Sequence, residues 1–73
     1  MKYQDRIISD PNILLGKPVI KGTRIPVELV LRKLAEGMTM EEFLVAYPHL
    51  SKEDILACLE YSVNVIAGEE MIA

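Results

Sequence analysis

The sequence contains no tryptophan, and among its 73 residues there is one phenylalanine, one histidine and one cysteine. A single thiol, Cys58, cannot form an internal disulfide or supply a cysteine-rich zinc site, so we expect it to be a buried side chain. The one histidine, His49, has no second histidine or nearby cysteine with which to hold a metal or activate a nucleophile. We therefore expect a protein that is not an enzyme and needs no cofactor.

The sequence also lacks long apolar runs. None approaches the ~20 residues of a membrane span, and the first residues, MKYQDRII, lack the apolar block of a signal peptide. We expect a cytoplasmic protein without a membrane partner. The length indicates a single domain over residues 1–73, and a core of this size buries only about 60% of the surface that the unfolded chain exposes. Marginal stability of this kind favours self-association, most simply as a two-fold homodimer.

Basic residues are scarce in the second half of the chain. Residues 1–37 contain seven Lys or Arg against four Asp or Glu, whereas in residues 38–73 Lys52 alone opposes seven acids. The net charge of -3 argues against non-specific binding of nucleic acids. An anionic partner is therefore expected to meet the first half.

The region 1–26 is expected to form short strands and a hairpin. Residues 6–9 are a strand candidate that ends at the turn signal DPN. After Pro18, the stretch VIKGTRI alternates around Lys21 and Gly22, and glycine can adopt the positive φ that a tight turn demands. The alternation predicts a small hairpin centred on this turn.

The region 27–73 is expected to form three helices. Apolar residues fall at helical spacing from Val27, and Gly37 is a stop signal. Thr39, with a glutamate three residues later, predicts a capping box at the start of a second helix, which ends at Pro48.

A third helix is predicted from the cap Ser51 to a stop at Gly68. Its core face is expected to contain Ile55, Leu59, Ser62, Val63 and Ile66. Two short helices before a longer one, with the tight connection PHL, are typical of a helix-turn-helix domain. The predicted fold is thus mainly α, a homeodomain-like three-helix domain preceded by short β-strands and a hairpin. Plain three-helix packing gives the same pattern, so helix order alone does not establish DNA binding.

Arg24 directly follows the predicted tight turn, at the end of a rigid hairpin. This position would hold its guanidinium at a defined place. The alternative is a structural salt bridge, for example to Asp54 or Glu28. Apolar residues outside the helical stripes indicate a dimer or partner surface; these are Leu29, Val45 and Val65.

The third helix starts with Lys52, Glu53 and Asp54, so a recognition helix here would bring two acids to the DNA polyanion. We expect any DNA contact to use other cations instead. The candidates are Lys17, Lys21, Arg32 and Lys33, with Lys52 the remaining basic residue of this helix.

The stretches GKPVIKGTRIPV, LAEGMT, YPHLSKEDI and ACLEY, in this order and spacing, resemble the small bacterial and archaeal proteins of domain of unknown function 433, which are regarded as antitoxins. The resemblance covers roughly residues 6–66. Its structural positions, together with the helix stops, are Gly16, Pro18, Gly22, Thr23, Pro26, Gly37 and Pro48.

The resemblance implies a homeodomain-like domain that neutralises a PIN-like ribonuclease toxin and represses its own operon by binding operator DNA. The candidate toxin-binding residues are Arg24, Lys21 and Leu29. Two other functions stay open: a stand-alone helix-turn-helix regulator, and a dimeric structural or interaction module.

Overall fold

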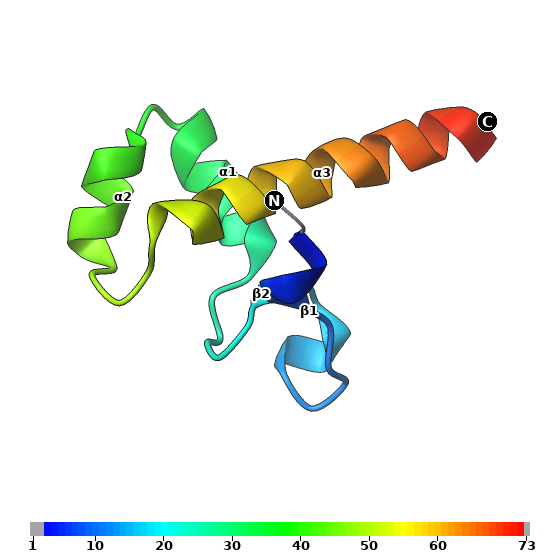
Figure 1. The fold of residues 1–73 in the computed structure, drawn as a ribbon, viewed down its shortest axis with the longest axis horizontal. Coiled ribbons are helices and arrows are strands. Elements are labelled where there is room, and N and C mark those ends of the chain that lie inside the picture. Colours follow the sequence, from blue (N-terminus) through cyan, green and yellow to red (C-terminus); the bar gives the residue numbers. More distant parts are fainter. Residues whose placement is uncertain (1–2, 73) are drawn as a thin grey trace.

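The computed structural model describes residues 3–72, and it contains three α-helices and a two-stranded sheet (Figure 1). The strands are β1 (Ile7–Ile8) and β2 (Val19–Ile20), and the helices are α1 (Val27–Ala35), α2 (Met40–Ala46) and α3 (Lys52–Ile72). Single turns of 3-10 helix precede each strand, at Tyr3–Asp5 and Leu14–Gly16. The predicted fold class is confirmed, since three helices follow a short antiparallel hairpin.

The sheet pairs β1 with β2 in antiparallel register, with Ile7 opposite Ile20. The predicted strand at 6–9 is therefore present. The predicted hairpin paired the residues on either side of Gly22, whereas β2 pairs with β1 instead. The turn around Gly22 forms, yet its return arm makes only an isolated bridge between Val19 and Pro26. The reason is local: Pro26 has no N–H to donate, and α1 begins at the next residue.

The core lies where the three helices and the strands meet. Ten apolar side chains are buried there: Ile7, Val19, Ile20, Val27, Val30, Phe43, Leu50, Ile55, Ala57 and Cys58. Phe43, from α2, is fully buried and stacks on Tyr47 with the ring centroids 4.7 Å apart. Phe43 is thus the largest of the fully buried side chains in the described structure.

Both predicted helix caps are present. The Glu42 N–H donates to Thr39 Oγ1 at 3.0 Å and the Thr39 N–H donates to Glu42 Oε1 at 2.8 Å, which is the reciprocal pattern of a capping box. Ser51 and Asp54 form the same pair of bonds at the start of α3. Asp54 also accepts a hydrogen bond from the Arg6 guanidinium at 3.0 Å, so it ties α3 to the N-terminal segment.

The predicted end of the third helix was wrong, because α3 continues through Gly68 to Ile72. A glycine stop requires positive φ, which Gly37 adopts and Gly68 does not. The predicted core face was wrong in part as well. Ile55 is buried, but Leu59, Val63 and Ile66 are 37%, 65% and 57% exposed. The last turns of α3 extend past the other elements (Figure 1), so this part of the helix has little to pack against in the described structure.

Cys58 is fully buried, as predicted, and burial, with a smaller effect of Asp54, raises the pKa of its thiol to about 12. Since the thiolate is the reactive form, we expect the native protein to react with a thiol reagent at pH 8 far more slowly than the urea-unfolded protein. Absorbance at the reagent's product wavelength follows both rates. Equal rates would contradict the burial.

Between residues 3 and 72, the structure has no helix of the length and apolarity needed to cross a membrane.

Candidate functional site

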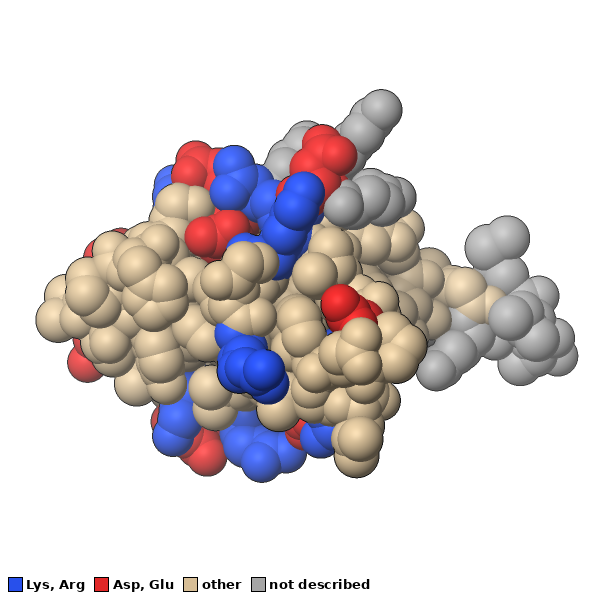
Figure 2. All heavy atoms as spheres, turned by 90° about the horizontal axis from the view of Figure 1, so that it is seen from below, with Lys and Arg blue, Asp and Glu red and all other residues tan. Residues whose placement is uncertain are grey.

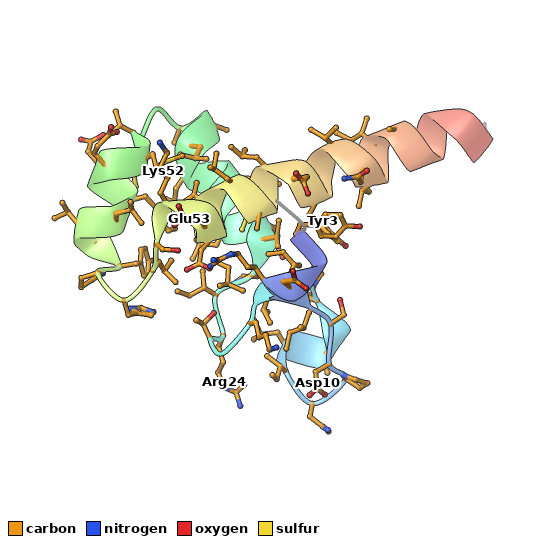
Figure 3. All side chains as sticks on the ribbon, viewed as in Figure 1. Tyr3, Asp10, Arg24, Lys52 and Glu53 are labelled. Carbon is orange, nitrogen blue, oxygen red and sulfur yellow. The ribbon has the colours of Figure 1, made fainter. Side chains whose placement is uncertain are left out.

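A tight turn at residues 20–25 presents Arg24 on the lower side of the molecule as drawn in Figure 3. Gly22 has a φ of 82°. The Thr23 hydroxyl donates to the Ile20 carbonyl at 2.8 Å and accepts from the Ile25 N–H at 3.0 Å. The Ile20 N–H donates back to the Ile25 carbonyl at 3.0 Å. These bonds hold both ends of the turn, so the backbone that carries Arg24 is fixed.

The Arg24 side chain is exposed and points away from the helices (Figure 3). Asp54 pairs with Arg6, and Glu28 pairs with Lys17. The two acids proposed as salt-bridge partners of Arg24 are therefore occupied by other cations. Within the described side chains, Arg24 forms no ion pair or hydrogen bond.

Gly22→Val is expected to lower the free energy of unfolding by ~1 kcal/mol or more, because a β-branched residue resists positive φ. Apart from the two flanking residues, no heavy atom of the described structure lies within 4 Å of a Cβ built at this position, so the cost is conformational rather than steric. Urea denaturation would measure it. An unchanged midpoint would show that the turn tolerates another backbone conformation.

Most of the other predicted basic residues are engaged in ion pairs. Arg32 pairs with Glu28 at 3.3 Å, and Lys33 lies 3.6 Å from Glu36. Lys17 pairs with Glu28, as described above. Three of the five DNA-binding candidates therefore belong to ion pairs. Two remain without one in the described part of the chain, Lys21 and Lys52.

Lys21 shares the turn with Arg24, whereas Lys52 starts α3 beside the exposed Glu53 (Figure 3). The Lys21 N–H donates to the Arg6 carbonyl at 2.7 Å, which anchors this end of the turn to β1. Leu29, the third toxin-binding candidate, is half-buried in α1. Of the three candidates, the structure brings together only Lys21 and Arg24.

The predicted structural residues fix the backbone on both sides of this turn. The Pro18 carbonyl accepts from the Val27 N–H at 2.9 Å, and Pro26 directly precedes α1. Gly16 and Gly37 have φ values of 86° and 103°. Farther away, Pro48 is exposed between α2 and α3. The motif thus determines the path of the chain into α1 and out of it.

Sequence reasoning missed the unusual backbone of the segment before Pro18. Leu14 and Leu15 both have positive φ, at 48° and 58°, a conformation that costs roughly 1–2 kcal/mol for a residue with a side chain. Leu15 is 96% exposed. Figure 1 places this segment on the lower side of the molecule, the side on which the turn that carries Arg24 also lies. No sequence pattern distinguishes it, because leucine is typical of helices and cores.

Figure 2 views the molecule from this lower side, and the surface there is mostly uncharged, with a separate basic group near its centre. Acidic and further basic groups lie around it, mostly towards the edges of this view. In the described residues no three His, Cys, Asp or Glu side chains gather as a metal site would require. The chemistry that this face offers is recognition of an anion by the exposed guanidinium of Arg24.

A second surface feature is an open apolar groove of about 280 Å³ between α1 and α3. It is lined by Pro18, Val27, Glu28, Leu31, Tyr61, Ser62, Val65 and Ile66. The prediction that Val65 belongs to an exposed apolar surface is consistent with its position here. No sequence pattern indicates the groove, because its residues lie in three separate segments.

Residues 7–62 match the family described as protein of unknown function, DUF433. This is more than half of the chain, which therefore belongs to the DUF433 family. The chain is 39% identical over 67 residues to the uncharacterized protein y4eO of Sinorhizobium fredii, covering 90% of this chain and 30% of that protein. It is also 54% identical over 28 residues to an uncharacterized protein of Archaeoglobus fulgidus, covering 38% of this chain and 78% of that protein.

The fold is similar to the crystal structure of a DUF433 member from Anabaena variabilis, with a TM-score of 0.80 and 33% identity. The match covers 84% of this chain and 60% of the Anabaena chain. The chain thus spans less than a third of y4eO and somewhat over half of the Anabaena protein. The family resemblance predicted from the sequence is confirmed, and the antitoxin role stays a prediction.

Proposed function

We propose that this DUF433 domain is a non-enzymatic antitoxin that binds a PIN-like ribonuclease toxin through the turn at residues 20–25. One observation carries the proposal: Arg24 is exposed, without an ion pair in the described structure, on a turn whose backbone is fixed. A guanidinium left free by its own domain is suited to a partner's carboxylate.

The inhibition follows from the chemistry of such nucleases, which hold a divalent metal ion with clustered carboxylates. A guanidinium presents planar, paired N–H donors that fit a carboxylate in bidentate geometry. Arg24 can therefore occupy carboxylates that the metal needs. Lys21 adds positive potential from the same turn, and little entropy is lost because the turn is already ordered.

The regulator alternative has weaker support from the charges. The first turn of α3, which would enter the major groove, carries Glu53 and Asp54 with Lys52. DNA binding by the isolated domain is therefore expected to be weak at physiological salt, and to depend on Lys17, Lys21, Arg32 or Lys33 rather than on Lys52.

The proposal is tested with a PIN-like nuclease, which is first sought among the genes that neighbour the gene for this chain. Both proteins are purified, and RNA cleavage is followed by gel while the chain is added. We expect cleavage to stop near an equimolar ratio, and a complex to appear in size-exclusion chromatography. Full nuclease activity in excess chain, with no complex, would refute the antitoxin function.

A further inference from the structure

The second half of α3 carries apolar side chains that nothing in the described structure covers. Val63, Val65 and Ile66 are 65%, 41% and 57% exposed. Leu59, one turn earlier, is also exposed. Leu59, Val63 and Ile66 follow one another at spacings of four and three, so they form one stripe along the helix. We call these four residues the α3 ridge.

This part of α3 is poorly suited to be a helix without packing. Val63, Val65 and Ile66 are β-branched, and Gly68 is among the weakest helix formers. These turns continue a helix whose first half is already packed, so they need no nucleation, but residues of low helix propensity add little stability by themselves. Burial of the ridge against a partner would stabilise them.

The same chain also has a groove into which such a ridge can pack. The groove between α1 and α3 is lined by apolar groups of Pro18, Val27, Leu31 and Tyr61. Val65 and Ile66 belong both to the ridge and to the groove wall. Ridge and groove are thus adjacent parts of one surface, which is the arrangement that a two-fold interface requires.

We propose that the occupant of the groove is a second copy of this chain. Two copies pair about a two-fold axis with their α3 helices antiparallel, so that each ridge lies in the other copy's groove. This places the homodimer interface at the α3 ridge and the groove, a surface that the antitoxin proposal does not use.

The charges favour this arrangement. After Lys52, the charged residues in the sequence of α3 are all acids. An antiparallel partner helix runs back along α1, whose last turn contains Arg32 and Lys33. The acidic α3 of one copy thus lies along the basic end of α1 in the other, and this complementary charge steers the two copies together.

Sedimentation equilibrium of the purified chain tests the interface. We expect a dimer, and we expect Ile66→Glu to raise the dissociation constant at least about 100-fold, because each of two symmetric contacts would bury an unpaired carboxylate. Val45→Glu is the matched control, since Val45 is 80% exposed on α2, outside the ridge and groove. It should dimerise like the natural chain.

Amide hydrogen exchange of the natural chain gives an independent reading that needs no variant. Exchange at residues 62–72 should slow as protein concentration rises, while exchange in α2 stays constant. A monomer at millimolar concentration, or a dimer unaffected by Ile66→Glu, would overturn the proposal. A monomer whose toxin binding is lost in Ile66→Glu would also overturn it and assign the groove to the toxin. Neither result bears on Arg24, which does not line the groove.

Discussion

Phe43→Ala is expected to lower the free energy of unfolding by ~3–5 kcal/mol, the usual cost of removing a buried aromatic ring. Phe43 is fully buried and stacked on Tyr47, and it is the largest of the fully buried side chains. The domain has only a small core, so neighbouring side chains can fill little of the cavity. A loss of this size would leave much of the protein unfolded at 37 °C if its total stability lies near the low end of the usual ~5–15 kcal/mol.

Urea denaturation at a fixed protein concentration measures this loss, and the concentration must be fixed because dimerisation adds to the apparent stability. Val45→Ala is the control: Val45 lies on the same helix but is exposed, so its change should stay within about 0.5 kcal/mol. A loss below about 1 kcal/mol for Phe43→Ala would mean that α2 is not packed as described.

Arg24→Glu is expected to abolish toxin inhibition while leaving the domain folded. Arg24→Ala should weaken binding by ~1.5–3 kcal/mol, about 10- to 150-fold, because it removes a hydrogen-bonded charge pair. Reversing the charge adds repulsion from the carboxylates of the toxin, so the loss should exceed that of the alanine variant. Arg24 makes no described contact within its own domain, and its substitution should therefore change the free energy of unfolding by no more than about 0.5 kcal/mol.

Isothermal titration with the purified toxin gives the affinities, and circular dichroism checks the fold. Lys52→Glu is the matched control, because Lys52 is another exposed cation without an ion pair in the described structure. It lies at the start of α3, away from the turn that carries Arg24. It should bind like the natural chain. An Arg24→Glu variant that still inhibits fully would move the toxin-facing surface elsewhere.

Features that depend on local chemistry could be predicted from the sequence. The capping box of Thr39, the cap at Ser51 and the glycine turns at Gly22 and Gly37 are each decided by a few adjacent residues. They fix where helices begin and where the chain reverses. The order and spacing of these signals were sufficient to predict three helices after a short hairpin.

Features that depend on contacts between distant segments could not be predicted. The partner of β2 is β1 rather than the return arm after the turn, and the choice depends on how both strands pack on the helices. The length of α3 was underestimated, because Gly68 resembles a stop but lies within the helix. The left-handed Leu14 and Leu15 violate local preference, so only the folded chain reveals them.

In the candidate site, too, local features could be predicted from the sequence and contacts between distant segments could not. The sequence indicated that Arg24 leaves a rigid turn, but it could not decide between an internal salt bridge and a free guanidinium. The structure shows Arg6 on Asp54 and Lys17 on Glu28, which are long-range pairs between segments. The groove beside α3 likewise joins three segments, and no local pattern indicates it.

The central claim is that Arg24 acts by pairing with the metal-binding carboxylates of a toxin, and a double-mutant cycle tests it most directly. Binding is measured for the natural pair, for Arg24→Ala, for a toxin with one metal-binding Asp changed to Asn, and for the two variants together. Direct pairing predicts a coupling energy of at least ~1.5 kcal/mol between the two changes, because each removes the same charged hydrogen bond. Effects that simply add, with a coupling near zero, would contradict the claim.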